Sequence, residues 1–541
     1  MSLSRIGCVI YLAAVVGCAG AAPETVITNA KIFTSNPAQP WAQAIAIRGE
    51  RIVAVGDTET VAALAGPATR RIDAGGRTII PGINDAHQHV GITPPHDRVE
   101  LPFDPTSEQI AEALRSQVAT SPAGRLIEGE IAQAAWADSS FSRAWLDQIA
   151  PEHPVRLTSY TGHGTLVNSR ALALIGITEA VKDPEGGHFG RDAQGRLDGR
   201  LEEYADYLSG RSLSSKTEPA DIVASYRRFA AEASRFGITS VQLMGNALPI
   251  ADVSKYLVEA AAPLRWKVFR FPMRESGGDT IDSRSPLPPQ PTPLIDVRGM
   301  KWILDGTPIE RFALMREPYL DSPSERGRLN FSTERIDQFV GWAYGSEDPL
   351  AVHAVGDGAI DAYVSAIERA GRPEVWRAKR PRIEHGDLLS ADLIDRVKAL
   401  GIVVVQNPLH FMRADLLAAR LGPQRMAAIQ PMKSLLDRGI PLAIGADGPI
   451  NPFLSIMAAV THPANPKEAL TREQAVTAYT AGSAFAEFQE QQKGQLASGM
   501  LADLAVLSAD LFTVPVPQLP SLQSVWTMVG GKVVHDAGVI H

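Results

Sequence analysis

The feature that most constrains the fold of this sequence is the alternation of apolar runs with amphipathic stretches through its long middle part. Short runs with strand character alternate there with stretches that carry apolar residues at helical spacing. This order is typical of parallel strands joined by helices. The strand candidates are residues 78–83, 237–243, 300–304, 350–355, 382–384, 402–406 and 442–446, and the helix candidates are residues 221–236, 333–344, 361–370, 390–400 and 433–439. We therefore predict an α/β chain that contains a (β/α)8 TIM barrel.

Both ends of the chain consist of short β-rich runs divided by turns. Gly49-Glu50 in the first set and Gly530-Gly531 in the second are hairpin signals. We expect a small β-sandwich built from residues 23–76 and 491–541, which flanks a barrel domain of residues 77–490. Within that domain the rhythm of strands and helices breaks over residues 91–220, which we interpret as an insertion.

Residues 1–22 have the pattern of an export signal, because Arg5 precedes a short apolar stretch that ends in small residues. The stretch falls short of the roughly 20 apolar residues that span a bilayer. Cys18 closes a run similar to a bacterial lipobox, in which the cysteine carries a lipid anchor. We expect an exported protein that is periplasmic, secreted, or anchored to the membrane at Cys18. Cys8 and Cys18 both lie in this segment, so the mature chain has no disulfide and no cysteine-based metal site.

The charge of the chain argues against a nucleic-acid partner. Lys and Arg number 52 against 60 Asp and Glu, which gives a formal net charge of −8, and no basic run could track phosphates. A redox role has no support either, since no glycine-rich dinucleotide motif follows a strand. The expected partner is a small molecule, and the sequence sets no oligomeric state.

His87, His89 and Lys301 are the first candidates for chemistry. The two histidines follow the apolar run 78–83, and residues i and i+2 of an extended chain point the same way, so both imidazoles can reach one ion. Lys301 lies within an apolar strand, where burial lowers the pKa of an amine and lets it add CO2 to form a carbamate. The alternatives are two surface histidines and a lysine whose head reaches water.

His353, His385 and Asp447 each end a predicted strand of the middle part. Barrel enzymes carry their chemistry at these strand ends. A single histidine there is more often a packed or loop residue, and an Asp before Gly commonly caps a turn. Two histidines at the same point of successive units are harder to explain in that way. The remaining histidines, His410 among them, lack this placement and are expected to be structural or solvated.

In this order, and with β-rich ends on either side, these residues resemble the metal-dependent amidohydrolase superfamily. More narrowly, the chain resembles amidohydrolase family 3, the group of the N-substituted formamide deformylase type. The resemblance rests on residues 81–89, 166–172, 301–306, 381–385 and 499–507, and it departs at Gln242, which stands where the family frequently has His. It implies hydrolysis of carbon–nitrogen bonds other than peptide bonds with one or two divalent ions, and zinc is the expected metal.

The resemblance also implies a ligand for each ion. His87, His89 and Asp447 would hold one ion, His353 and His385 the other, and Lys301 would bridge them as its carbamate. Asp447 would act as general base and then as general acid. His163 lies beside the family-like stretch 166–172, and we expect it to stabilise the developing oxyanion, the alternative being a solvated loop histidine.

Three functions remain open at this point. The first is hydrolysis of an amide or N-formyl compound. The second is hydrolysis of an ester, a lactone or a cyclic amide, because the same hydroxide can attack either kind of carbonyl. The third is a surface binding protein that keeps the barrel without the chemistry, which the loss of a ligand would favour.

Overall fold

The computed structural model describes residues 21–540, except 103, 133–134, 137, 139, 246 and 274–287. The predicted export segment, with Cys18, lies outside the described residues apart from its last two positions. None of the described helices is both long and apolar enough to cross a membrane.

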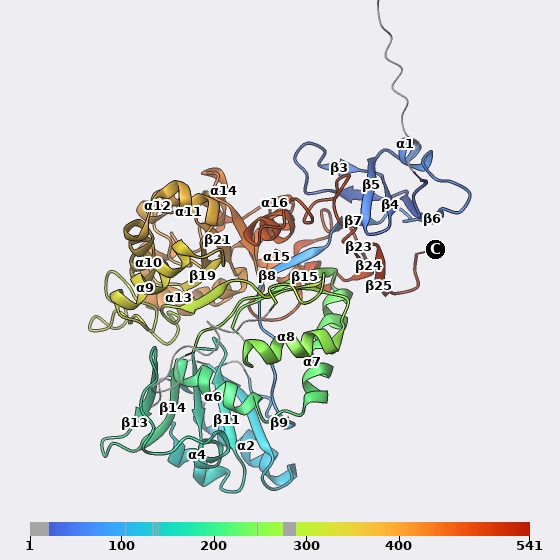
Figure 1. Ribbon diagram of the computed structural model, residues 1–541. Coiled ribbons are helices and arrows are strands. Elements are labelled where there is room, and N and C mark those ends of the chain that lie inside the picture. Colours follow the sequence, from blue (N-terminus) through green and yellow to red (C-terminus); the bar gives the residue numbers. More distant parts are fainter. Residues whose placement is uncertain are drawn as a thin grey trace, which may run out of the picture.

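The middle of the chain carries nine parallel strands in two sheets (Figure 1). The first sheet has the order β17-β16-β15-β8 and the second runs from β18 to β22 in chain order. Their bounds are β8 Ile83–Gln88, β15 Ile238–Leu243, β16 Arg265–Val268, β17 Ile295–Asp296, β18 Met300–Ile303, β19 Leu350–Ala354, β20 Arg382–His385, β21 Val403–Gln406 and β22 Leu442–Ile444. The prediction of a mixed α/β fold is confirmed.

Two contacts link the first parallel sheet to the second. A parallel bridge joins Arg270, just beyond β16, to Met300 of β18. At the other side, the Asp447 N–H beyond β22 donates to the carbonyl of His87 in β8 at 2.9 Å. The pairing of the described residues nonetheless divides the strands into two sheets, so the closed barrel is not established by it.

Helices connect these strands and pack on them in one large apolar cluster. All five helix candidates contain a helix. The bounds are α7 Pro219–Arg235, α8 Ile250–Ala260, α9 Thr333–Gly345, α10 Asp357–Ala370, α11 Pro373–Lys379, α12 Ala391–Leu400, α13 Ala414–Met426, α14 Met432–Asp437, α15 Pro452–Thr461, α16 Arg472–Thr477 and α17 Ser483–Ala486. The parallel strands are short and largely buried, as strands covered by helices are.

The prediction of a single strand over residues 78–83 is wrong. β7 (Thr78–Pro81) pairs with β2 and β23, whereas β8 begins at Ile83 and pairs with β15. Gly82 divides the two strands, and a Cβ there would lie 2.1 Å from the Thr239 hydroxyl oxygen. The chain therefore leaves one sheet and enters another at a position where only glycine fits. β16 was also missed by the sequence analysis.

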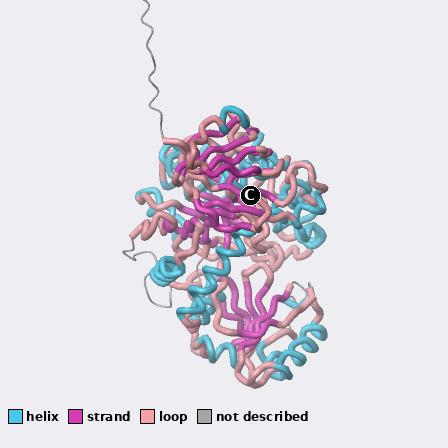
Figure 2. Tube along the Cα trace, turned by 90° about the vertical axis from the view of Figure 1, so that its right-hand side faces the viewer, coloured by secondary structure: helices cyan, strands magenta, loops and turns pink. Residues whose placement is uncertain are grey.

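The predicted insertion contains a sheet of its own, which lies apart from the parallel strands in Figure 2. Six strands follow the order β13-β14-β12-β11-β10-β9, where the sequence analysis predicted only a break in the rhythm. The bounds are β9 His96–Arg98, α2 Ser107–Thr120, β10 Leu126–Ile131, α4 Arg143–Ile149, β11 Val155–Ser159, β12 Gly164–Val167, α5 Ser169–Ile175, β13 Gly187–Arg191, β14 Leu197–Glu203 and α6 Tyr204–Ser214.

Strands from both ends of the chain share a six-stranded sheet of order β25-β24-β23-β7-β2-β3, and a four-stranded sheet has the order β5-β4-β1-β6 (Figure 1). An apolar cluster contains residues of both sheets, among them Ile45 and Trp526. Both predicted hairpins are present. The bounds are β1 Thr25–Thr28, β2 Lys31–Phe33, β3 Trp41–Ala42, β4 Ala44–Arg48, β5 Arg51–Gly56, α1 Thr58–Ala62, β6 Arg70–Asp73, β23 Leu504–Leu507, β24 Ser524–Val529 and β25 Lys532–Asp536. The domain boundaries stay predictions.

Candidate active site

All seven side chains singled out in the sequence line one cavity of about 460 Å³ at the ends of the parallel strands. They are His87, His89, His163, Lys301, His353, His385 and Asp447. Six of them come from β8, the residue just after it, β18, β19, β20 and the loop after β22, whereas His163 lies between β11 and β12 of the insertion. Residues spread over most of the chain therefore meet in one place, as the strand-end placement predicts.

Two of these residues have backbones in the left-handed region. His385 has a φ of 72° and Asp447 a φ of 45°, and each directly precedes a glycine. This conformation is uncommon for a residue with a side chain, and it concentrates at functional sites. It turns each side chain into the cavity just where its strand ends.

Asp447 directs one carboxylate oxygen at His87 in β8 and His89 just after it. Its Oδ1 lies 3.2 Å from His89 Nε2 and 3.7 Å from His87 Nε2. Around a tetrahedral ion with bonds of about 2.0–2.1 Å, ligand atoms lie about 3.3 Å apart. The candidate ligand atoms of these three residues all lie within 4.8 Å of one another, so the group has the dimensions of a metal site.

The other oxygen of Asp447 faces a second pair of histidines. Its Oδ2 lies 3.2 Å from His410 Nε2 and 3.7 Å from His385 Nδ1, and these residues form a second group with metal-site dimensions. Asp387 contacts the opposite nitrogen of His410, Nδ1, at 3.2 Å. Although burial opposes it, the two carboxylates raise the pKa of His410 to about 10.

His410 was expected to be a structural or solvated residue, and its contacts with Asp387 and Asp447 make it a packed residue beside the candidate ligands. It follows β21 at the same edge of the sheet as the other histidines, within the short helix η2 (Pro408–Arg413). The predicted strand 402–406 ends four residues before it, so the strand-end rule could have included His410 had it allowed a longer loop.

A buried chain of charged groups orients His87. The Arg382 guanidinium donates to both oxygens of Glu384, at 2.7 and 3.0 Å, and Glu384 Oε2 lies 2.7 Å from His87 Nδ1. Although burial raises it, the charge of Arg382 and the contact with His87 bring the pKa of Glu384 down to about 2. Burial lowers the pKa of His87 to about 4. The ring is thus held neutral, with Nε2 toward the cavity, as metal-bound histidines are.

Gln242 is part of this buried network of Arg382, Glu384 and His87 and does not line the cavity. Its side-chain oxygen accepts a hydrogen bond from Arg382, and its nitrogen donates to the carbonyl of Ser483 at 3.0 Å. The departure at Gln242 therefore leaves the candidate ligands unchanged, and it adds an acceptor for a fully buried guanidinium.

Lys301 and His353 both have the properties of ligands. Burial lowers the pKa of Lys301 to about 8, which makes the neutral amine accessible near physiological pH. His353 Nε2 is buried and has no hydrogen-bond partner among the described residues. Because a buried polar atom without a partner is costly, this nitrogen fits a metal ligand better than a packed histidine. The alternative of a solvated lysine does not hold for Lys301, which is buried. Of the two histidines that could have been surface residues, His87 is buried, whereas His89 is exposed at the mouth of the cavity.

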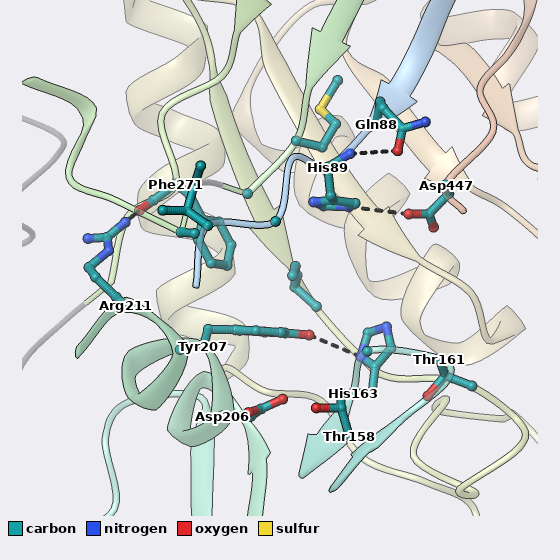
Figure 3. A pocket seen from close by; sticks show the side chains of 18 of the residues that line it. Gln88, His89, Thr158, Thr161, His163, Asp206, Tyr207, Arg211, Phe271 and Asp447 are labelled. Carbon is teal, nitrogen blue, oxygen red and sulfur yellow. Dashed lines mark hydrogen bonds and ion pairs between the residues drawn. The ribbon is translucent and has the colours of Figure 1, made fainter. Parts of the chain in front are cut away.

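His163 faces the metal-ligand candidates from the opposite wall of the cavity, while His89 and Asp447 lie on the other side (Figure 3). Its ring centroid is 4.8 Å from that of His353. Although burial opposes it, the Glu203 carboxylate raises the pKa of His163. The alternative of a solvated loop histidine is wrong, since His163 is buried.

Comparison with known proteins shows the family of this chain. The model of the amidohydrolase family matches residues 70–535. The chain is 28% identical to protein LONG AFTER FAR-RED 3 of Arabidopsis thaliana, over 95% of this chain and 92% of that protein. It is 26% identical to the N-substituted formamide deformylase of Arthrobacter pascens, over 94% of this chain and 97% of that enzyme. A metal-dependent hydrolase of Pyrococcus horikoshii has the same fold, with a TM-score of 0.70 and 22% identity over 91% of this chain and 99% of that one.

The chain therefore belongs to the amidohydrolase family. It is a metal-dependent hydrolase that acts on carbon–nitrogen bonds. None of the ligands that the resemblance implies is missing from the cavity, so the binding-protein alternative has no observation in its favour.

The pKa shifts of His87 and Glu384 predict that acid destabilises the metal-free protein. The unfolded chain binds a proton at His87 near its ordinary pKa of 6.5, whereas the folded chain does so only near 4. Stability is therefore complete above pH 6.5 and falls as the pH drops toward 4, by about 1–3 kcal/mol. Glu384 acts in the same sense from pH 4.5 to 2. Chemical denaturation at a series of pH values measures this slope.

The variant His87→Asn should flatten the slope between pH 6.5 and 4. His188→Asn is the matched control, because that ring is half-exposed, contacts Asp183 and lies in β13 of the insertion. Equal slopes in His87→Asn and in the unchanged protein would contradict the assignment of this pH dependence to His87.

Proposed function

We propose that this protein is an exported amidohydrolase that cleaves the amide or N-formyl bond of a small molecule. The observation that carries the proposal is the convergence of His87, His89 and Asp447 within 4.8 Å at one end of a cavity. A volume of about 460 Å³ suits a ligand of drug-like size. Apolar side chains line part of the rest of the cavity, among them Ile92, Leu213, Met244 and Phe271, beside polar ones such as Arg156 and Arg211. We therefore propose a substrate that has an apolar acyl or amine part.

The residues present fit one or two divalent ions, and zinc suits their nitrogen and oxygen donors. His87, His89 and Asp447 would hold one ion, and His353 and His385 the other, with Lys301 between them as its carbamate. A bound ion supplies Lewis acidity, which lowers the pKa of water toward 7. We further propose that eight strands, β8, β15, β16 and β18 to β22, close into a (β/α)8 barrel, and that the end sheets form a β-sandwich. The two links between the parallel sheets and the shared apolar cluster support this arrangement.

The protein's own residues then move the proton and stabilise the charge. Asp447 accepts a proton from the attacking water and passes it to the leaving amine, because an amine anion is a poor leaving group. His163 donates a hydrogen bond to the carbonyl oxygen as negative charge develops on it, from the wall opposite Asp447. An ester, a lactone or a cyclic amide could react by the same steps, and a substrate panel separates these alternatives.

The variant Asp447→Asn tests the proposed chemistry. Loss of the proton carrier should lower kcat/KM for N-formyl and N-acyl amines by ~10²–10⁴-fold while the fold survives. Hydrolysis rates and circular dichroism measure the two effects. Retained hydrolysis in Asp447→Asn would remove this residue as the proton carrier, and a panel of amides untouched by the metal-loaded protein would contradict the proposed substrate class.

The identity of the second ion's ligands can be tested by metal content. Elemental analysis of protein purified without chelator should find about two ions per chain. His353→Ala should lower this to about one, because His353 Nε2 is buried and has no hydrogen-bond partner among the described residues, its nearest carboxylate being Asp305 at 3.8 Å. His410→Ala should keep both, since Asp387 and Asp447 already engage its two ring nitrogens. Two ions in His353→Ala and about one in His410→Ala would instead assign the second ion to His385, His410 and Asp447.

Export can be tested on the mature N-terminus. We propose that a signal peptidase cuts the chain either directly before Cys18 or after the small residues that follow Cys18. Mass spectrometry of the cell-purified protein should find a chain that begins at a lipid-carrying Cys18, or a lipid-free chain that begins near Ala22. The variant Cys18→Ser should abolish only the lipidated form. A full-length chain that begins at Met1 in cells with an active export pathway would contradict export.

A further inference from the structure

Glu203 lies behind His163 at the point where the insertion meets the parallel strands. Its two carboxylate oxygens lie 3.1 and 3.2 Å from His163 Nδ1. Tyr207 adds a phenol group to the same pair, because its hydroxyl lies 3.2 Å from His163 Nδ1 and donates to Glu203 Oε2 at 3.4 Å. Both the Glu203 carboxylate and the His163 ring are buried. A buried carboxylate with these partners is held in place and is not a solvated surface group.

The backbone at Glu203 is in a conformation that favours glycine. It has a φ of 53° and a ψ of −126°, at the junction of β14 and α6. Residues with side chains rarely adopt such angles, and those that do cluster at functional sites. The backbone N–H of Glu203 donates to the carbonyl of His163 at 3.3 Å, so main chain and side chain hold the same partner.

Segments that follow β18 complete the surroundings of the Glu203 carboxylate. The Asn330 side-chain nitrogen donates to Glu203 Oε2 at 3.0 Å and to the carbonyl of Ile303 at 3.1 Å. Gly306 leaves room for the carboxylate, since a Cβ there would lie 2.4 Å from Glu203 Oε1. The carboxylate is therefore fixed from the side of the metal-ligand candidates as well as from the insertion.

We infer that Glu203 is a positioning residue for the hydrolysis. It holds the His163 ring with Nδ1 toward the carboxylate, which leaves Nε2 as the nitrogen that faces a substrate in the cavity. Without this contact the ring could rotate or take the other tautomer, and its hydrogen bond to the substrate oxygen would be lost. The inference rests on the proposed function, in which His163 stabilises the developing oxyanion.

The variant Glu203→Gln removes the charge and keeps the size of the side chain. We expect kcat to fall by about 10²-fold with KM little changed, because the lost hydrogen bond strengthens only in the transition state. Glu202→Gln is the matched control. That neighbouring side chain alternates to the other face of β14 and pairs with Arg328, so kcat should stay within about twofold.

A double-mutant cycle separates positioning from a purely structural role. His163→Asn alone should lower kcat by about 10²–10³-fold. If Glu203 acts through His163, adding Glu203→Gln to His163→Asn should cause no further loss. Unchanged kcat in Glu203→Gln, or an equal loss in both backgrounds, would overturn the inference.

A second measurement does not depend on activity. In metal-free protein labelled with 15N at histidine, a buried Nδ1–H signal should disappear in His163→Asn, which assigns it, and also in Glu203→Gln. Its persistence in Glu203→Gln would overturn the inference. Should the unchanged protein hydrolyse none of the amides, the proposed function would fail while this spectrum still decides whether Glu203 orients His163.

Discussion

The buried contact of Arg382, Glu384 and His87 is the interaction on which the rest of the site depends. The buried Glu384 carboxylate is stable there only because the opposite charge of the Arg382 guanidinium lies beside it. The guanidinium in turn needs Gln242 and a backbone carbonyl to accept its remaining hydrogen bonds. The contact crosses from β20 to β8 and so fixes one histidine relative to strands that lie far along the chain. Asp447 then reaches His87 and His89 with one oxygen and a second histidine pair with the other. These buried polar contacts can therefore form only when the strands have this order, and they in turn hold the strands in it.

The strand-end placement explains how much of the site could be predicted from the sequence. Apolar runs gave the position of β15, β18, β19, β20, β21 and β22, and parallel strands bring their ends to one edge of a sheet. His353, His385 and Asp447 follow from that rule alone, because each ends such a run. His87 and His89 follow from it as well, although the strand that carries them begins five residues later than the predicted one. The Lys301 assignment needed the family resemblance beside the pattern.

What the sequence did not show depends on backbone angles and on loops. His410 lies four residues beyond β21, and nothing in its neighbours marks the turn that brings it back to Asp447. Glu203 stands in a sequence of ordinary strand residues, and only its buried contacts and its φ and ψ reveal it as special. The sheet of the insertion was missed because its six strands are ordered by long-range pairing that no local period records. Gly82 marks a change of sheet that the continuous apolar run 78–83 conceals.

The hydrogen bond between the Asp447 N–H and the His87 carbonyl has a consequence for synthesis on the ribosome. It pairs a residue near the start of the chain with one that leaves the ribosome only when most of the protein has been made. Until then, His87 and His89 lack the Asp447 carboxylate as a partner. A chain that ends before residue 447 never acquires it. The group of His87, His89 and Asp447 can therefore form only after residue 447 has been made.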